Sequence, residues 1–261
     1  AAAGTALLAG ARAASAAPIE PMPARWDEAF DIVVIGSGFA GLAAAIEARK
    51  AGASVCVLEK MRAIGGNSAI NGGIMGVPRS PMQIKQGYED SPELMAEDML
   101  REGAGLNHPE KVLYMCQQAL PTWEWTVKEL GVEWVQERVS QEGGHSVPRC
   151  AILVGGSGSQ IVNKEAAKLA QLGVKPRTRT YLERIIRDAD GRVKGVQVRE
   201  GYRFPDPKSG RVKYICAKKA VILCHGGFGA DIAFRQIQDP KLTEKLGTTN
   251  QPGATSEVWR E

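Results

Sequence analysis

The stretch that decides the fold runs from Phe30 to Glu59 and reads FDIVVIGSGFAGLAAAIEARKAGASVCVLE. It opens with Ile32–Ile35, which is apolar without alternation, as in a parallel strand covered on both faces. A glycine-rich turn follows, and Leu42–Lys50 then predicts a helix that ends near Gly52. The second apolar run, Ser54–Leu58, predicts another strand. The stretch therefore predicts a strand–helix–strand unit with parallel strands.

The turn between the first strand and the helix has the glycine spacing of a dinucleotide-binding site. Gly36 permits the tight turn, Gly38 lets a pyrophosphate approach the backbone, and Gly41 lets the helix pack closely on the strand. The helix N-terminus offers unpaired N–H groups to phosphates. Glu59 lies 18 residues beyond Gly41 (59 − 41), close to the roughly 20 expected for an acid that binds a ribose diol. These features predict dinucleotide binding, because a packed unit without a ligand would leave the acid unexplained.

The residues after Glu59 favour FAD over NAD as the dinucleotide. A nicotinamide-binding domain would normally continue into another crossover helix and strand. Here two glycine pairs, Gly65–Gly66 and Gly72–Gly73, are interleaved with Asn67, Ser68 and Asn71 in a long polar loop. Such a loop can place backbone and amide groups along a cofactor that extends away from the first strand–helix–strand unit.

These motifs resemble a flavoprotein family that includes fumarate reductases such as flavocytochrome c, the succinate dehydrogenase flavoprotein subunit, urocanate reductase and 3-ketosteroid dehydrogenase. Two later segments strengthen the resemblance. Ala220–Gly229 looks like the family's second glycine signature, in which a buried strand runs into a turn beside the cofactor. Thr248–Glu257 resembles its Asn-x-Pro-Gly-Ala-Thr-Gly-Asp/Glu loop, which in relatives contacts the flavin end. The resemblance spans Phe30 to Glu261.

The resemblance implies a set of cofactor-binding residues, in which Leu182 contributes its backbone to the adenine. They are Gly36, Ser37, Gly38, Phe39, Ala40, Gly41, Glu59, Lys60, Gly65, Gly66, Asn67, Ser68, Asn71, Gly72, Gly73, Leu182, Gly226, Gly227, Asn250, Gly253, Ala254, Thr255 and Glu257. It also implies that the catalytic groups lie beyond Glu261, so none is assigned within this sequence, and a chain ending there is expected to be inactive alone.

Three features depart from the family pattern or refine it. Ser256 stands where a glycine is usual, which puts the turn that aims Glu257 in question. His225 stands where alanine or threonine is common, and a lone histidine there is more often packed or hydrogen-bonded than catalytic. Members that attach FAD covalently carry a histidine shortly before the Gly-Gly pair, and Gly66–Ile70, which precedes Gly72–Gly73, contains none. The resemblance therefore implies non-covalent FAD.

Composition excludes several other functions. With 44% hydrophobic and 24% charged residues in 261, the sequence is that of a globular protein. The net charge of +4 is small and the basic residues are scattered, which argues against a nucleic-acid-binding stripe. The five cysteines form no CxxC pair and no CxxCH haem attachment site, so neither a metal site nor a bound haem follows. Cys56 and Cys224 fall in apolar runs and are expected to act as small hydrophobic residues.

The first residues differ in composition from the rest. Residues 1–17 form an alanine-rich run, in which Ala14-Ser15-Ala16, before Ala17-Pro18, has the small-x-small form of a signal-peptidase site. The run is too short and mild for a membrane span. We interpret it as the remnant of an export signal, with residues 18–29 as a linker and 30–261 as an FAD-binding domain that is incomplete at its C-terminus. Twin-arginine export to the periplasm is the expected route, because FAD binding requires prior folding. A disordered tail on a cytoplasmic protein is the alternative.

The middle of the sequence predicts helices around a glycine-rich loop. Ser91 is expected to cap one helix, Asn107 the next, and Pro121 to start a third that carries Trp123 and Trp125. The tryptophans are expected to pack in a core, with flavin stacking as the alternative. In the loop Gly143–Arg149, His145 and Arg149 are candidates either for flavin or pocket contacts or for a structural role in the loop.

The last third predicts a helix and a run of strands. Gln160–Leu172 is expected to be the helix. The strands expected after it are Thr178–Leu182, Arg184–Asp188, Val193–Arg199, Arg211–Ala217 and Ala220–Leu223, with Asp188–Gly191 as a hairpin turn. The fold class is therefore α/β: a Rossmann-like FAD-binding domain with a parallel sheet and an inserted antiparallel β-meander, and with the family's capping domain absent from this chain.

The resemblance implies an FAD-dependent oxidoreductase. The leading hypothesis is reduction of an activated C=C bond of a fumarate- or urocanate-like enoate by hydride transfer from flavin N5. One alternative is an α,β-dehydrogenase of the 3-ketosteroid or succinate type, and another is a non-catalytic flavin-binding electron-transfer fragment. The expected partners are an unsaturated acid or steroid-like substrate and a c-type cytochrome or quinol-linked electron donor, with no nucleic acid, metal or membrane span.

Overall fold

The computed structural model describes residues 22–261. The predicted export-signal remnant (1–17) and residues 18–21 of the predicted linker lie outside the described residues. The predicted linker ended at residue 29, but the first strand already begins at Glu28. Within the described part of the chain, no helix is long and apolar enough to cross a membrane.

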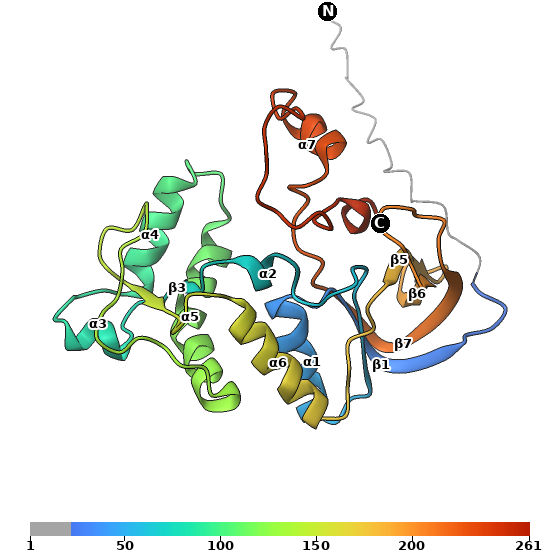
Figure 1. Cartoon of the computed structure of the whole chain (residues 1–261), viewed down its shortest axis with the longest axis horizontal. Coiled ribbons are helices and arrows are strands. Elements are labelled where there is room, and N and C mark those ends of the chain that lie inside the picture. Colours follow the sequence, from blue (N-terminus) through green and yellow to red (C-terminus); the bar gives the residue numbers. More distant parts are fainter. Residues whose placement is uncertain (1–21) are drawn as a thin grey trace, which may run out of the picture.

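A five-stranded sheet forms one half of the molecule (Figure 1). Its order is β2-β1-β7-β6-β5. The strands are β1 (Glu28–Ile35), β2 (Val55–Leu58), β5 (Thr180–Arg187), β6 (Val193–Glu200) and β7 (Arg211–Leu223). β1 pairs in parallel with β2 and β7, whereas β5, β6 and β7 pair antiparallel. This arrangement confirms the predicted parallel sheet with an inserted meander.

In two places, two strands that were predicted as separate form one continuous strand in the structure. Arg211–Ala217 and Ala220–Leu223 are both part of β7, which pairs with β6 along its first half and with β1 along its second. The polar pair Lys218–Lys219, between the two predicted strands, is exposed and forms a β-bulge, because Phe30 pairs with Ala217 but Ile32 pairs with Ala220. β5 likewise runs through a second bulge, at Glu183, where two strands were predicted.

Both faces of the parallel strands are covered by apolar residues. On one face lie α1 (Phe39–Lys50) and α6 (Ser159–Gln171), which Figure 1 shows side by side. Their core joins Val34 and Val57 of the sheet to Leu42 of α1 and Leu169 of α6. On the other face the sheet curls, so that residues of β1 and β2 share a second core with residues of β5 and β6. This burial explains the unbroken apolar runs in the sequence.

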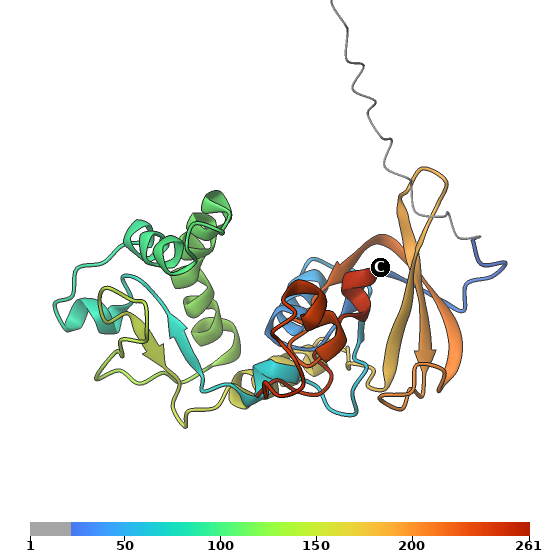
Figure 2. The same cartoon turned by 90° about the horizontal axis from the view of Figure 1, so that it is seen from above.

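The other half of the molecule is a helical lobe at the opposite end from the β5–β6 hairpin (Figure 2). It contains β3 (Ile74–Gly76), β4 (Cys150–Ile152), α3 (Pro81–Lys85), α4 (Pro92–Glu102) and α5 (Pro109–Leu130). β3 and β4 pair antiparallel. Ser91 caps α4 as predicted, since its hydroxyl accepts a hydrogen bond of 3.0 Å from the Leu94 amide.

Two predictions about α5 are wrong. Asn107 is not its cap: His108 occupies that position, because Pro109 sits in the first turn and shifts the start by one residue. Pro121 does not start a new helix but lies inside α5, with its ring exposed. A proline at such a position costs one hydrogen bond and clashes with the preceding turn, about 3 kcal/mol. Buried Cys116 and Trp123, on either side of it, anchor both halves of α5 and offset that cost.

Candidate cofactor site

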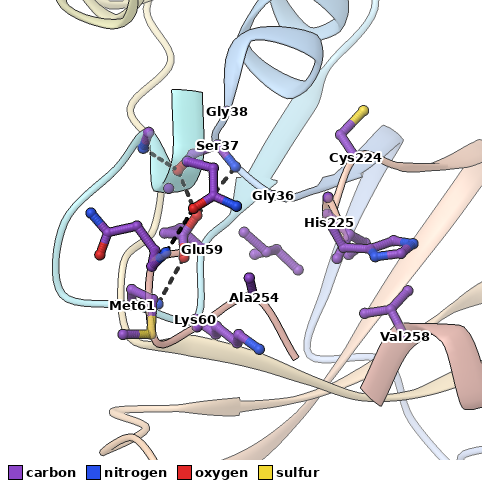
Figure 3. Close-up of a pocket in the computed structure, with 18 of the residues that line it drawn as sticks. Gly36, Ser37, Gly38, Glu59, Lys60, Met61, Cys224, His225, Ala254 and Val258 are labelled. Carbon is purple, nitrogen blue, oxygen red and sulfur yellow. Dashed lines mark hydrogen bonds between the residues drawn. The ribbon is translucent and has the colours of Figure 1, made fainter. Parts of the chain in front are cut away.

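A cavity of about 260 Å³ opens at the carboxyl ends of the parallel strands (Figure 3). Its walls come from the turn after β1, the end of β2 and the loop after it, the start of β5, the turn after β7 and the C-terminal loop. Open α/β sheets bind ligands in a crevice outside the carboxyl ends of their strands. The segments that the sequence singled out therefore meet at one site, among them Lys60 and Glu257, which lie 197 residues apart in the chain.

The glycine turn after β1 requires its glycines. Gly36 has φ +101°, and a Cβ there would lie 2.3 Å from the carbonyl oxygen of Cys224. A Cβ at Gly41 would lie 2.0 Å from the carbonyl oxygen of Gly36. The N-terminus of α1 has no side-chain cap on Gly38 and no acid in its first turn. It presents a partial positive charge to the cavity, which suits a phosphate.

Glu59 at the end of β2 is buried and organises the turn. Its Oε2 accepts hydrogen bonds from the Ser37 hydroxyl (2.6 Å) and the Ser37 amide (3.2 Å), and its Oε1 accepts one from the Met61 amide (2.8 Å). Figure 3 shows these bonds on one wall of the cavity. The Ser37 hydroxyl also accepts a hydrogen bond of 3.2 Å from the Gly65 amide. The predicted ribose-binding acid thus also connects the glycine turn to the polar loop after β2.

The polar loop after β2 and the C-terminal loop are joined by amide side chains. The loop after β2 contains the short helix α2 (Gly66–Ile70). Asn67 donates from Nδ2 to Asn250 Oδ1 (2.6 Å) and accepts at Oδ1 from the Gln251 amide (2.7 Å). This pairing joins Asn67, which lines the cavity, to Asn250, and the sequence assigned both residues separately to cofactor binding.

Lys60 joins the C-terminal loop to the end of β2. Its Nζ donates to the Thr255 hydroxyl and lies 3.0 Å from Glu257 Oε2, while the Thr255 hydroxyl donates to Glu257 Oε2 at 2.6 Å. Burial raises the pKa of the Glu257 carboxyl, but the Thr255 hydroxyl and Lys60 together bring it below its ordinary value. Glu257 is therefore an anion paired with Lys60, which neutralises it.

Ser256, which stands where the family usually has a glycine, fits the C-terminal loop without backbone strain. Ser256 has φ −90°, a conformation open to any residue, and it precedes the short helix η1 (Glu257–Arg260). Its hydroxyl donates to Asp231 Oδ2 at 2.6 Å, and its amide donates to the same oxygen at 3.2 Å. Asp231 in turn caps α7 (Ile232–Gln238). The serine hydroxyl therefore makes a hydrogen bond to Asp231 that a glycine at this position could not make.

Most residues that the sequence predicted for the cofactor line this cavity. These are Gly36, Ser37, Gly38, Phe39, Ala40, Glu59, Lys60, Gly65, Gly66, Asn67, Ser68, Leu182, Gly226, Gly227, Gly253, Ala254, Thr255 and Glu257.

The remaining predicted residues lie outside the cavity lining: Gly41, Asn71, Gly72, Gly73 and Asn250. Gly41 sets the helix–strand packing, and Asn250 holds Asn67. Asn71 closes a turn, since its Oδ1 accepts from the Gly73 amide at 2.7 Å.

Several cavity residues were not predicted. Thr180 and Tyr181 precede Leu182 at the start of β5, and Met61, Gln251 and Val258 each directly follow a predicted residue. Their closeness in the chain to predicted cofactor-binding residues is the one feature of the sequence that could have placed them in the cavity. Tyr181 stacks on Tyr202 with ring centroids 4.7 Å apart, so its ring orientation depends on a residue of another segment.

His145, Arg149 and the tryptophans of α5 do not line the cavity. Arg149 is fully buried in the helical lobe, paired with Asp90 (2.8 Å) and Asp98 (2.6 Å). His145 Nδ1 lies 2.8 Å from an Arg149 nitrogen, and burial lowers its pKa. Trp123 packs on Trp134 in the lobe core. Of the two alternatives for the loop, the structure therefore shows the structural role of His145 and Arg149. Of the two alternatives for Trp123, it shows packing in a core.

Comparison with known proteins agrees with this geometry. The family model described as "FAD binding domain" matches residues 31–257. The acrylate reductase flavoprotein subunit of Shewanella woodyi is 41% identical over 234 residues, covering 89% of this chain and 46% of that protein. The urocanate reductase of Eggerthella lenta is 38% identical over 230 residues, covering 87% and 36%.

Among solved structures, the open conformation of a flavocytochrome c3 fumarate reductase superposes with a TM-score of 0.81 at 26% identity, covering 89% of this chain and 40% of that one. The chain thus spans less than half the length of these relatives.

Proposed function

This chain belongs to the FAD binding domain family, and we propose that it is the cofactor-binding part of an FAD-dependent oxidoreductase that reduces the activated C=C bond of an enoate. The observation that carries the proposal is the single cavity built from the glycine turn, Glu59, the polar loop after β2 and the C-terminal loop. The names of the relatives supply the substrate class: acrylate, urocanate and fumarate are all unsaturated acids.

The residues around the cavity fit FAD. The α1 N-terminus, where Ser68 Oγ accepts from the Phe39 amide (3.1 Å) and no acid lies in the first turn, suits the pyrophosphate. Gly66, Gly226 and Gly227 leave open space where side chains would intrude. Glu59 can accept hydrogen bonds from a ribose, and the Lys60–Glu257 pair holds the C-terminal loop against the cofactor. When bound, FAD supplies the hydride chemistry, and the protein supplies placement and electrostatics.

The substrate class is tested with the full-length gene product. Reduction of acrylate, urocanate and fumarate is followed by the oxidation of a reduced artificial dye, with saturated acids as the control. Turnover of at least one enoate supports the proposal. Dye oxidation that no enoate accelerates, in protein that contains FAD, would contradict it.

FAD is expected to be bound without a covalent link. The histidine and the cysteine that line the cavity, His225 and Cys224, lie on the turn after β7, and burial raises the pKa of the Cys224 thiol, which keeps it in its unreactive form. Acid or heat precipitation of the holoprotein should therefore release free FAD into the supernatant. A flavin that stays with the precipitate would contradict this prediction.

Replacing Glu59 should weaken FAD binding. A carboxylate that accepts hydrogen bonds from a ribose contributes about 1.5–3 kcal/mol, so Glu59→Ala should lower the affinity roughly ten- to hundredfold. Loss of the acceptor for Ser37 and Met61 should loosen the turn as well, so Glu59→Gln, which keeps one oxygen, should be milder.

Fluorescence titration with FAD measures the effect on the full-length protein. Glu97→Gln is the control, because Glu97 is exposed on α4 in the helical lobe. Equal FAD affinity in Glu59→Ala and the parent protein would mean that the acid serves the turn alone.

We further propose that the whole protein is exported to the periplasm by the twin-arginine route, and that it receives electrons from a c-type cytochrome or a quinol-linked donor. The small-x-small pattern in residues 1–17 supports the first proposal. Subcellular fractionation of cells that express the full gene tests it, and recovery of the mature protein only in the cytoplasm would contradict it.

A further inference from the structure

Three exposed arginines lie beside the cofactor cavity, and we call Arg62, Arg179 and Arg203 the basic rim. Arg62 directly follows Met61 in the chain, and Arg179 directly precedes Thr180. Met61 and Thr180 both line the cavity. The basic rim therefore adjoins the cavity, although none of its three members belongs to the lining.

Backbone hydrogen bonds bring the three segments of the basic rim together. The Arg179 amide donates to the Met61 carbonyl (3.0 Å), and the Arg179 carbonyl accepts from the Tyr202 amide (2.8 Å). Arg62 and Arg203 are the next residues after these two partners. Arg179 has φ +52°, which residues other than glycine rarely adopt, and its two backbone hydrogen bonds hold it in that conformation. The loop after β2, the segment before β5 and the segment after β6 therefore meet at one place.

The charges of the basic rim are not neutralised by acids of the chain. Among residues 22–261, none of its three guanidinium groups has an ion pair or a hydrogen bond. Other cations nearby differ in this respect: Lys60 pairs with Glu257 at 3.0 Å, and Arg199 pairs with Glu183 at 2.7 Å. The basic rim therefore keeps its full positive charge at the cavity.

Two carboxylates near the basic rim leave it positive. Asp206, in the loop after β6, is exposed, but exposed Lys208 in the same loop offsets its charge. Glu59 is buried in the cavity wall, where it accepts hydrogen bonds from Ser37 and Met61. Three cations without partners outnumber this one anion, so the electrostatic potential at this side of the cavity is positive.

We propose that the basic rim steers FAD into the cavity by long-range attraction of its negatively charged pyrophosphate. This inference rests on the proposed function, since it requires FAD as the ligand. Exposed charges act over about one Debye length, which is about 10 Å at 0.1 M salt and about 30 Å at 0.01 M. Such a field raises the association rate constant. It leaves the dissociation rate constant nearly unchanged, because the exposed arginines act on the approaching cofactor without touching the bound one.

The test measures FAD association with the full-length protein, stripped of FAD, by stopped-flow flavin fluorescence. The rim variant combines Arg62→Gln, Arg203→Gln and Arg179→Asn, because asparagine tolerates a positive φ better than glutamine does. At about 10 mM salt the association rate constant should fall about tenfold, and at about 1 M salt, where the Debye length is about 3 Å, it should fall less than about twofold. The dissociation rate constant should stay within about twofold of the parent value at both salt concentrations.

A matched control removes the same charge from the helical lobe. The lobe variant combines Lys85→Gln in α3, Lys111→Gln in α5 and Arg138→Gln between α5 and β4, all at exposed positions. It should bind FAD as fast as the parent protein does. Equal association rate constants in the rim variant and the parent at low salt, or equal slowing in the lobe variant, would overturn the steering role alone. A rim variant that is altered only in dissociation would overturn it too. Absence of FAD binding by the parent protein would overturn the proposed function as well.

Discussion

Replacing Arg149 by alanine should lower the free energy of unfolding by about 3–5 kcal/mol, because the substitution leaves buried Asp90 without its counter-charge and leaves buried Asp98 with only the exposed Arg101. The side chains of Arg149 and Asp90 are completely buried, and that of Asp98 is 2% exposed. Arg149 donates to Asp90 from Nε and Nη2 and to Asp98 from Nη1, at 2.6–2.9 Å. The measurement is urea unfolding of the full-length protein, followed by a signal from the helical lobe such as tryptophan fluorescence.

Arg101 provides the matched control for this experiment. It also pairs with Asp98, at 2.9 Å, but its side chain is 56% exposed. Arg101 is largely in water and Asp98 keeps Arg149 as its buried partner, so Arg101→Ala should lower stability far less than Arg149→Ala does. A triple variant, Arg149→Met with Asp90→Asn and Asp98→Asn, should recover much of the loss because no buried charge remains.

The same variants separate the structural role from a role in cofactor binding. If Arg149 reached the flavin, Arg149→Lys would weaken FAD binding while stability changed by less than about 1 kcal/mol. The ion pairs predict the opposite: a loss of stability with unchanged FAD affinity in the protein that remains folded. Burial raises the pKa of Asp98, but the Ser146 amide and Arg149 hold it well below its ordinary value. The ion pair is therefore expected to weaken only in strong acid.

The parts of the site that depend on local conformation could be predicted from the sequence. Gly36 and Gly41 are required by a positive φ and by close backbone approach, and both requirements show as glycine at a fixed spacing. Glu59 was predicted because a strand delivers it, and strands are recognised from apolar runs. The same reasoning placed the meander and its hairpin.

The parts that depend on distant partners could not be predicted. Arg149 was equally compatible with a pocket and with a structural loop, because nothing in the sequence shows that Asp90 and Asp98 would enclose it from 59 and 51 residues away. Ser256 was recognised as a departure, but its compensation by Asp231 appears only in three dimensions. Pro121 stays within a helix because tertiary packing outweighs local propensity.

The ionisation of buried Glu165 should make the stability of the core beneath the cofactor site depend on pH. It lies on α6, is 2% exposed, and its Oε2 has no hydrogen-bond partner in the described part of the chain. Burial raises the pKa of its carboxyl from 4.5 to about 8. Because α6 packs on α1 and α2, the helices that begin at the cavity, ionisation of Glu165 would destabilise the support of the cofactor site.

The direction of the pH dependence follows from the raised pKa. Between pH 4.5 and 8 the unfolded chain has lost this proton and the folded chain retains it, so folding binds a proton and stability falls as pH rises. Above about pH 8 the folded form must also ionise, and the full penalty is present. A shift of this size corresponds to about 4–5 kcal/mol.

Glu165→Gln should remove this penalty, since the amide imitates the protonated carboxyl without ionising. The variant and the parent protein should be similarly stable at pH 5, and the variant should be the more stable by several kcal/mol at pH 9, as measured by urea unfolding of the full-length protein. Glu97→Gln, at an exposed position of α4, should show no such divergence. Coincident stability curves for Glu165→Gln and the parent protein across pH 5–9 would mean that water reaches the Glu165 carboxyl in solution, because only a solvated carboxylate can ionise in the folded state without cost.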